Sequence, residues 1–350
     1  MFFTDKKVIG LDIGTSSIKM AEMNVSRNNI QLVNFGYAPM PLGCVQSGEL
    51  TNTNEISAAI STLVKDLKTK RKNISVGLWG TAVIIKKITI PRMDNRMIAD
   101  QIRWEAEQYI PFDINEISLS YHVLKNSANP ETMDILLVAA QNALVQQYQS
   151  IVENAGLSPQ IMDVSGLALA NLYETNYGSG LGECVGILNI GAGLTNFVVV
   201  YDGDVVFCRD IPVGGLTFTN EIHKELGITV QEAEAMKLSS VHGKEVPEEV
   251  QQVILTTTDA VIEEIRNSFD FFAASGSGVQ LQTCYFTGGG SQMPGLTEGL
   301  SKMAGVSFEQ FNPFLRVRNG AKHLSHEYLS EMSPYVSVAM GLALRKSGDE

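Results

Sequence analysis

Three hydroxyl side chains and a lysine lie within one short turn near the start of the sequence, in Asp12-Ile13-Gly14-Thr15-Ser16-Ser17-Ile18-Lys19. Glycine permits backbone conformations in which successive N–H groups point at one anion, and a lysine reaches a phosphate oxygen. An aspartate at the end of an apolar strand is suited to hold Mg²⁺ through water. The turn is therefore a candidate phosphate cradle, with Asp12 as its candidate metal residue. An ordinary hairpin turn is the alternative interpretation.

A second glycine-rich bend, Gly191-Ala192-Gly193-Leu194-Thr195-Asn196, follows half a chain later. The strand patterns before the two bends, at 10–14 and 187–191, superpose with an offset of 177 residues, which is 189 minus 12. A repeat of half the chain length predicts two related domains. A phosphate held between two such domains needs one loop from each, so the pair of bends favours a phosphate site over two unrelated turns.

Three further groups of residues complete the candidate site. Gly288-Gly289-Gly290-Ser291 follows an apolar strand, and such a loop lets a flat ring lie against the backbone, although a surface linker has a similar composition. Gly214-Gly215 is another pair of glycines in this set. Glu234 and Lys237 are three residues apart, so on a helix they face the same way and are able to bond sugar hydroxyls. A simple surface salt bridge is the other interpretation of that pair.

The elements that position these residues follow from hydrophobic periodicity. The first half is predicted to contain strands at 8–13, 18–24 and 30–37, a helix at 56–67, a strand at 74–78 and a helix at 164–173. Between them, residues from about 83 to 156 have a separate alternation of strands and helices, which predicts an inserted subdomain. The second half is predicted to contain strands at 185–190, 195–201 and 205–211, helices within 217–274, and a further strand and helix from 281.

The composition excludes several classes of protein. A formal charge of -12 disfavours general binding to nucleic acid or anionic lipid, because the field of the protein repels phosphate. The four cysteines have neither zinc-site nor disulfide-framework spacing, which indicates a reducing cytoplasm. Neither a signal peptide nor an apolar run long enough to cross a bilayer is predicted, so we expect membrane contact only through a partner.

The order of these motifs resembles the superfamily of actin, Hsp70 and FtsA, and the stretches 102–112 and 334–345 resemble the PilM family of type IV pilus assembly proteins. The resemblance implies an α/β fold of the actin-like ATPase, ribonuclease H-like type, with two duplicated domains and an inserted FtsA-like 1C (SHS2) subdomain. It implies domain 1 at 1–180, with 1C at about 83–156, and domain 2 at 181–350, with a helical 2B at about 215–275. The last ~15 residues are expected to return to domain 1.

The resemblance also implies the cofactors ATP and Mg²⁺. Gly14, Thr15, Ser16, Ser17 and Lys19 would hold the phosphates from one side, and Gly191, Gly193, Thr195, Asn196, Gly214 and Gly215 from the other. Glu234 and Lys237 would hold the ribose, and Gly288, Gly289, Gly290 and Ser291 the adenosine. Asp12 would bind Mg²⁺ through water, and Asp163 would orient water. Asn189 replaces the usual aspartate of this superfamily, so we expect weak or no hydrolysis.

The implied function is that of a cytoplasmic ATP-binding scaffold of type IV pilus biogenesis and twitching motility. In PilM-like proteins the inserted subdomain helps to form a groove that takes the N-terminal cytoplasmic peptide of the inner-membrane protein PilN. The protein would then be peripheral to the inner membrane through PilN, and further pilus or motor components and self-association are compatible with this function. An FtsA-like cell-division filament and a small-molecule kinase of the same superfamily are the alternatives.

Overall fold

In the described residues, the first half of the protein contains a large sheet, a two-stranded sheet, an inserted three-stranded sheet and four helices. The structure, a computed structural model, describes residues 7–346 except 27–28, 47, 126, 128, 276–277 and 322. The elements before the insertion are β1 (Ile9–Ile13), β2 (Ser17–Ser26), β3 (Asn29–Pro39), β4 (Val45–Gln46), β5 (Glu49–Leu50), α1 (Thr53–Leu67) and β6 (Asn73–Leu78). The insertion contains β7 (Val83–Pro91), α2 (Asn95–Tyr109), β8 (Ile117–Val123) and β9 (Thr132–Gln141), and the chain continues with α3 (Asn142–Asn154), β10 (Ser158–Val164) and α4 (Ser165–Tyr177).

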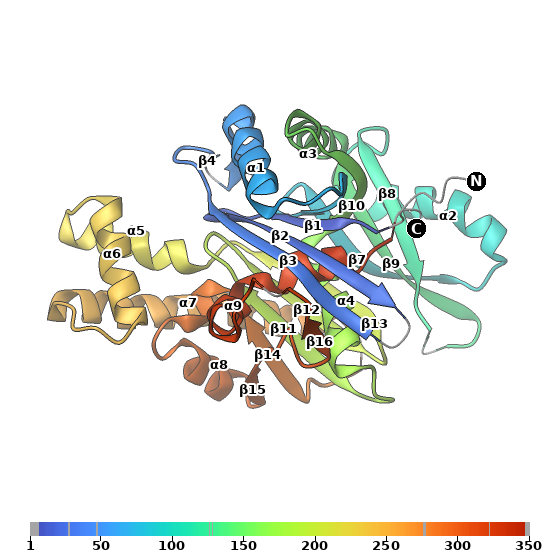
Figure 1. Ribbon diagram of the computed structural model, residues 1–350. Helices are drawn as coiled ribbons and strands as arrows, with labels where there is room; N and C mark the ends of the chain where they lie inside the picture. The colour runs from blue at the N-terminus through green and yellow to red at the C-terminus, as the bar shows by residue number, and fades with distance from the viewer. Residues whose placement is uncertain are drawn as a thin grey trace.

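The second half repeats this plan without an inserted sheet in the described residues. Its strands are β11 (Cys184–Ile190), β12 (Thr195–Tyr201), β13 (Asp204–Ile211), β14 (Thr283–Thr287), β15 (Ser307–Gln310) and β16 (Val317–Asn319). Its helices are α5 (Gly215–Leu226), α6 (Val230–Val241), α7 (Glu248–Ala274), the 3₁₀ turn η1 (Gly289–Gln292), α8 (Leu296–Ala304) and α9 (His326–Ala343). Figure 1 places α5 and α6 at one end of the molecule and the insertion at the other.

The two large sheets have the same topology. The order β3-β2-β1-β6-β10 in the first sheet corresponds to β13-β12-β11-β14-β15 in the second, and β16 extends the first sheet beside β3. Each sheet begins as an antiparallel meander and ends with two parallel strands. The duplicated α/β fold that the half-chain repeat predicts is confirmed.

Helices α4 and α9 lie between the two sheets and give them a shared core (Figure 1). One hydrophobic cluster contains side chains from both sheets and from both helices. Strands β1 and β11 are apolar along almost their whole length because helices or the other sheet cover both of their faces. The shared core therefore fixes how the ends of β1 and β11 face each other.

Two glycines allow α9 to approach its neighbours at backbone distance. A Cβ atom on Gly10 of β1 would lie 1.9 Å from the carbonyl oxygen of Ala339, and one on Gly341 would lie 1.9 Å from that of Ala168. Any side chain at either position would push α9 away from β1 or α4. The glycines are thus a packing requirement of the centre of the molecule.

The inserted sheet, in the order β7-β9-β8, has its own small core. Asp94 caps the N-terminus of helix α2, since its carboxylate accepts a hydrogen bond from the N–H of Arg96, and the helix buries Ile98 and Ile102 against the sheet. Helix α3 packs elsewhere, in the cluster that contains α1 and β1. The predicted limits of the domains and of the insertion stay a prediction.

Five of the described strands were not predicted from the sequence pattern. Two of them, β4 and β5, have only two residues each. Strand β10 contains Pro159 and a bulge between Pro159 and Ile161, which interrupt its alternation of apolar and polar residues. Strands β15 and β16 have four and three residues, too few for a periodicity to be recognised. No helix in the described part of the chain is long and apolar enough to cross a bilayer.

Asp163 at the end of β10 holds the C-terminal end of the chain against the first sheet. Its Oδ2 lies 2.7 Å from Nη1 of Arg345, which follows α9, and its Oδ1 accepts the N–H of Val164 at 2.8 Å. Loss of hydration on burial raises the pKa of this carboxyl, although Arg345 and the Val164 N–H both oppose that change. Both oxygens of Asp163 therefore have structural partners.

We predict that Gly341→Ala lowers the free energy of unfolding by about 2 kcal/mol or more, because the new methyl group meets a backbone carbonyl that has no free rotamer to adopt. Urea unfolding measures the change. Gly299→Ala in α8 is the matched control, since its methyl group would meet the flexible end of Ile262. We expect the control to change stability by less than about 1 kcal/mol, and equal losses in the two variants would contradict the packing argument.

We also predict how Asp163→Asn changes the pH dependence of stability. The folded protein holds a proton on Asp163 more tightly than the unfolded chain does, so the contribution of this group is present below its unfolded pKa, near 3.8, and decreases as pH rises through the folded pKa. The variant lacks that decrease. The stability of wild type relative to the variant should therefore fall as the pH rises above the unfolded pKa, and urea unfolding at several pH values would show a constant or rising difference if the burial argument were wrong.

Candidate functional site

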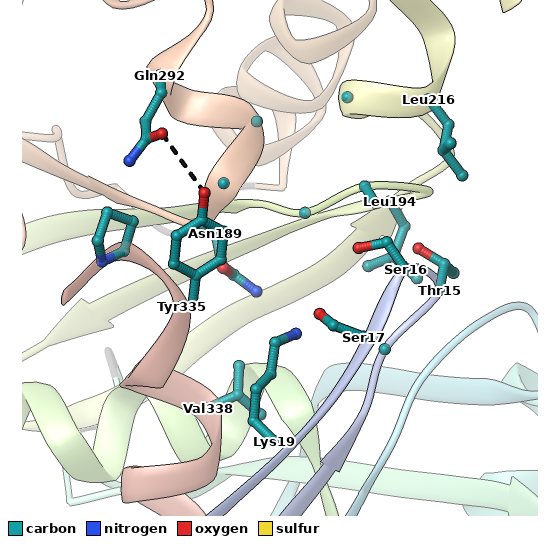
Figure 2. Close-up of a pocket in the computed structure, with 18 of the residues that line it drawn as sticks. Thr15, Ser16, Ser17, Lys19, Asn189, Leu194, Leu216, Gln292, Tyr335 and Val338 are labelled. Carbon is teal, nitrogen blue, oxygen red and sulfur yellow. Dashed lines mark hydrogen bonds between the residues drawn. The ribbon is translucent and has the colours of Figure 1, made fainter. Parts of the chain in front are cut away.

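One cavity of about 310 Å³ lies between the two halves of the protein. The turn after β1, the turn after β11, the start of α5, helix α6, the loop before η1 and helix α9 all contribute to its wall. Figure 2 shows side chains from both halves directed into this space. Its volume is at the lower end of the range for small-molecule sites, which is roughly 300–1,000 Å³.

The first glycine bend is held by its strands. Asp12 and Lys19 are directly opposite each other in the antiparallel pair of β1 and β2, and Oδ2 of Asp12 lies 3.1 Å from Nζ of Lys19. The N–H of Gly14 donates to the carbonyl oxygen of Ser17 at 3.0 Å and closes the turn. Both charged side chains are largely buried, so the cation is fixed at the wall of the cavity.

The second bend has the same construction with different chemistry. Asn189 and Asn196 are opposite each other in β11 and β12, at positions 177 residues after Asp12 and Lys19, since 189 minus 12 and 196 minus 19 are equal. Nδ2 of Asn189 donates to Oδ1 of Asn196 at 2.8 Å. An amide pair in the second half thus occupies the place of the ion pair in the first.

The two bends touch directly. The N–H of Gly193 donates to Oγ1 of Thr15 at 2.7 Å, although the residues are 178 positions apart. A Cβ atom on Gly193 would lie 2.8 Å from Cγ2 of Thr15, so only glycine permits this approach without displacement. The contact closes the cavity at the end where both turns meet.

Helix α5 braces the second bend. Its first amides, on Gly215 and Leu216, donate to the carbonyl oxygens of Gly191 at 2.9 Å and Ala192 at 2.7 Å. A Cβ atom on Gly214 would lie 2.6 Å from those same oxygens. Gly214 therefore serves the packing of the bend, while Gly215 also lines the cavity.

Helix α6 places Glu234 and Lys237 on the cavity wall. The helix begins with a capping box in which Thr229 and Glu232 bond each other's backbone N–H groups, which fixes the direction of the helix. Nζ of Lys237 lies 2.7 Å from Oε2 of Glu234 and 3.2 Å from the carbonyl oxygen of Gly215. The side chain of Lys237 is 8% exposed and that of Glu234 is 38% exposed, so the carboxylate is the more accessible partner.

The glycine loop at 288–290 lies close to the end of β11. Gly288 has a φ of 88°, which favours glycine, and a Cβ atom there would lie 2.3 Å from the carbonyl oxygen of Ile190. A Cβ atom on Gly289 would lie 2.5 Å from the ring of Tyr335 on α9. Figure 2 shows the hydroxyl of Tyr335 bonded to Oε1 of Gln292, at 3.5 Å. The loop thus presents bare backbone beside an aromatic ring.

Ser165 contributes a buried hydroxyl to the same cavity. It is the first residue of α4 and is 3% exposed, and its Oγ has no hydrogen-bond partner among the described residues. A buried hydroxyl without a partner is costly, so a polar ligand in the cavity would remove that cost. This atom is an independent sign that the cavity accepts a polar molecule.

Most of the residues predicted from the sequence line this one cavity. They are Asp12, Gly14, Thr15, Ser16, Ser17, Lys19, Asn189, Gly191, Asn196, Gly215, Glu234, Lys237, Gly288, Gly289 and Gly290. The lining does not include Asp163, Gly193, Thr195, Gly214 and Ser291. The hydroxyls of Thr195 and Ser291 donate to the carbonyl oxygens of Val213 and Gly288, so they hold the loops together. The roles of all these residues toward a ligand stay predictions.

Several lining residues were not predicted from sequence. Tyr37, Trp79, Ser165 and Tyr335 come from four elements far apart in the chain and carry no local signal of a site. Nε1 of Trp79 donates to the carbonyl oxygen of Ile13 at 2.6 Å and supports the first bend from below. Burial raises the pKa of the Tyr335 hydroxyl, which therefore stays protonated near neutral pH. Asp210 of β13, which accepts a hydrogen bond from Nδ2 of Asn196, was also not predicted from the sequence.

The donor set fits a phosphorylated ligand accompanied by a metal ion. Lys19 and the bare backbone of two glycine bends suit phosphate oxygens, and Asp12 beside Lys19 suits a hydrated Mg²⁺. The described residues include no cluster of three or more His, Cys, Asp or Glu able to hold a metal. A magnesium ion that keeps its water and binds phosphate needs no such cluster.

Comparisons with solved structures support this fold. A structure titled "PilM-PilN type IV pilus biogenesis complex" is 28% identical, has a TM-score of 0.85, and the match covers 97% of this chain and 98% of that chain. The ethanolamine utilization protein EutJ from Carboxydothermus hydrogenoformans is 14% identical with a TM-score of 0.56, over 98% of this chain and 91% of that chain. The second match shows the shared fold alone.

Sequence comparisons extend the similarity to FtsA cell division proteins. The protein from Neisseria meningitidis serogroup B is 26% identical over 65% of this chain, which spans 60% of the length of that protein. The protein from Enterococcus hirae is 22% identical over 87% of this chain and 78% of its own length. The family model described as "Type IV pilus assembly protein PilM" matches residues 10–347. With its actin-like fold, the chain therefore belongs to the PilM family of type IV pilus assembly proteins.

Proposed function

We propose that this protein is a cytoplasmic scaffold of type IV pilus assembly that binds Mg-ATP between its two sheets and docks the N-terminal cytoplasmic segment of PilN beside the inserted sheet. The observation that carries the proposal is the direct contact of two equivalent glycine bends, from Gly193 to Thr15, at one end of a cavity lined by both halves. The similarity to the PilM-PilN complex over 97% of the chain supports the choice of partner.

The cavity residues divide into groups with different tasks toward the nucleotide. Lys19 and the N–H groups of the two bends bind phosphate oxygens, and Asp12 accepts hydrogen bonds from the water of Mg²⁺. The accessible carboxylate of Glu234, held by Lys237, accepts from the ribose hydroxyls. Bare backbone at 288–290 and the ring of Tyr335 take the base. Because each sheet supplies one phosphate loop, nucleotide binding sets the angle between the two halves.

Hydrolysis is proposed to be slow or absent. The carboxylates that line the cavity in the described part of the chain are Asp12, which is paired with Lys19, and Glu234, which is paired with Lys237. Asn189 is an amide and is no base, and Asp163 lies outside the lining with both oxygens bonded. A small-molecule kinase needs a free general base at this place, so the same observation favours the scaffold over the kinase.

A second cavity of about 360 Å³ is the proposed site of the PilN segment. Its wall combines Val83, Ile84 and Ile85 of β7 with Glu49 of the first half and with residues 208–212 around the end of β13. Among the described strands, β7 pairs with β9 only, so its other edge is able to bond an extended peptide, as many peptide-binding domains do. Docking there would bring the protein to the inner membrane through PilN.

We predict that Lys19→Met weakens Mg-ATP binding by about tenfold or more, because a charge-assisted bond to phosphate contributes roughly 1.5–3 kcal/mol. Calorimetric titration measures the affinity. Lys87→Met removes a comparable ion pair, 2.8 Å from Asp134 in the inserted sheet, and serves as the control with unchanged affinity. Wild type saturated with Mg-ATP should also melt at a higher temperature. No titration signal in wild type would exclude nucleotide binding.

We predict that Ile84→Glu weakens the binding of a labelled PilN N-terminal peptide by at least about tenfold, because a carboxylate would replace apolar surface in the docking cavity. Fluorescence anisotropy measures the binding, and a melting curve establishes that the variant is folded. Tyr121→Glu, on the opposite edge strand β8, should leave the affinity within about twofold of wild type. Equal losses, or a loss only for Tyr121→Glu, would place the peptide elsewhere.

A further inference from the structure

Three polar side chains form a row across neighbouring strands, and the first two of them line the nucleotide cavity. Asn189, Asn196 and Asp210 are consecutive cross-strand partners in β11, β12 and β13. Nδ2 of Asn189 donates to Oδ1 of Asn196 at 2.8 Å, and Nδ2 of Asn196 donates to Oδ1 of Asp210 at 2.6 Å. We call these three residues the amide row.

The chemistry of Asp210 fixes the direction of the whole row. Both of its oxygens accept hydrogen bonds, from Gly80 and from Asn196, and the ionised carboxylate has no donor, so Asn196 must turn its NH₂ group toward Asp210. The carbonyl oxygen of Asn196 then faces Asn189, which donates to it through its own NH₂ group. This leaves Oδ1 of Asn189 as the free end of the row, beside Gly288 on the cavity wall, where a Cβ atom on Gly288 would lie 2.7 Å from it.

We infer that Asp210 is a positioning residue of the nucleotide site: through Asn196 it turns the carbonyl oxygen of Asn189, and not its NH₂ group, toward the ligand. An isolated amide can turn either its NH₂ group or its carbonyl oxygen toward a ligand, and the NH₂ group would be repelled by a hydrogen-bond donor of the ligand. The hydrogen bonds of the amide row fix the carbonyl oxygen in that place. This inference rests on the proposed nucleotide binding and concerns the same cavity.

The equivalent row in the first half shows what the amide row replaces. There the cross-strand partners are Asp12, Lys19 and Tyr37, so the carboxylate is in the first strand and faces the cavity itself. In the second half the carboxylate belongs to Asp210 in β13, two strands away from the position of Asn189 in β11. Its negative charge still polarises the two amides, because hydrogen-bonded chains transmit polarisation from one group to the next.

The ligand group that an amide oxygen suits is a hydrogen-bond donor. A phosphate oxygen is an acceptor and would be repelled, whereas the water bound to a divalent cation donates strongly. The amide row therefore serves the hydrated metal ion that accompanies the nucleotide. Without a carboxylate in direct contact, the row orients metal-bound water but has no group to take a proton from it, which agrees with slow hydrolysis.

Asp210 has a second partner that its replacement must preserve. Its Oδ2 accepts the N–H of Gly80 at 2.8 Å, where the chain leaves β6 for the inserted sheet. Loss of hydration raises the pKa of Asp210, while the bonds from Gly80 and Asn196 act against that change. Asp210→Asn keeps an oxygen for Gly80, but its NH₂ group can donate to Asn196 and so allows the row to reverse.

The test compares the affinity for the non-hydrolysable analogue ADPNP with Mg²⁺ and with EDTA, by calorimetric titration. In Asp210→Asn we expect the gain in affinity caused by Mg²⁺ to fall by about tenfold, while the affinity in EDTA stays within about threefold of wild type. The control is Asp204→Asn at the other end of β13, where the buried carboxylate bonds the N–H of Lys125 and touches no residue of the row. Both of its affinities should match wild type.

A swapped variant keeps the inference testable if Asp210→Asn folds poorly. In Asn189→Asp combined with Asp210→Asn, the carboxylate is at the cavity end, and all hydrogen bonds of the row are satisfied in the reverse direction. The Mg²⁺-dependent gain should return to the wild-type level or above it, with the melting temperature restored. A purely structural role for Asp210 gives no reason for this recovery of metal dependence.

The outcomes are distinct. Wild-type Mg²⁺ dependence in Asp210→Asn, or an equal loss of affinity with and without Mg²⁺, would overturn the positioning role while leaving nucleotide binding intact. A swapped variant that folds but regains no Mg²⁺ dependence would also overturn it. Wild-type protein that binds ADPNP under neither condition would remove the proposed function, and the inference with it.

Discussion

The hydrogen bond from the N–H of Gly193 to Oγ1 of Thr15 is the contact on which the candidate site depends, because it joins two bends that are half a chain apart. It exists only if the ends of β1 and β11 face each other at backbone distance. Glycine at 193 removes the steric obstacle, and the cross-strand pairs behind each bend hold the turns in shape. A cavity lined from both sides is then a consequence of the topology.

The shared core makes this contact possible and also able to respond to a ligand. Helices α4 and α9 pack against both sheets, and the glycines at 10 and 341 bring α9 to backbone distance from β1 and from α4. A packed core of this kind moves as rigid units and not as a continuous medium. The cavity wall also adjoins the second cavity, since Thr15, Trp79 and Leu194 line both. A nucleotide in the first cavity and a docked peptide in the second would therefore contact the same residues.

The sequence was most informative where chemistry depends on residues close in the chain. The meanders follow from spacing alone. Gly14 and Gly191 of the two bends and the pair Glu234 and Lys237 line one cavity, and their roles toward a ligand stay predictions. The residues that were missed come from tertiary packing: Ser165 and Tyr335 reach the cavity only because α4 and α9 cross between the sheets. Local pattern also failed to tell which hydroxyls face a ligand, because Thr195 and Ser291 bond nearby carbonyl groups instead.

A crystal structure of the protein with Mg²⁺ and a non-hydrolysable ATP analogue tests the central claim most directly. Our account predicts that the phosphates lie between the first bend, at 14–19, and the second bend, at 191–196, in contact with backbone N–H groups of both. Density for the nucleotide at any other place, or phosphates held by only one of the two bends, would contradict the account.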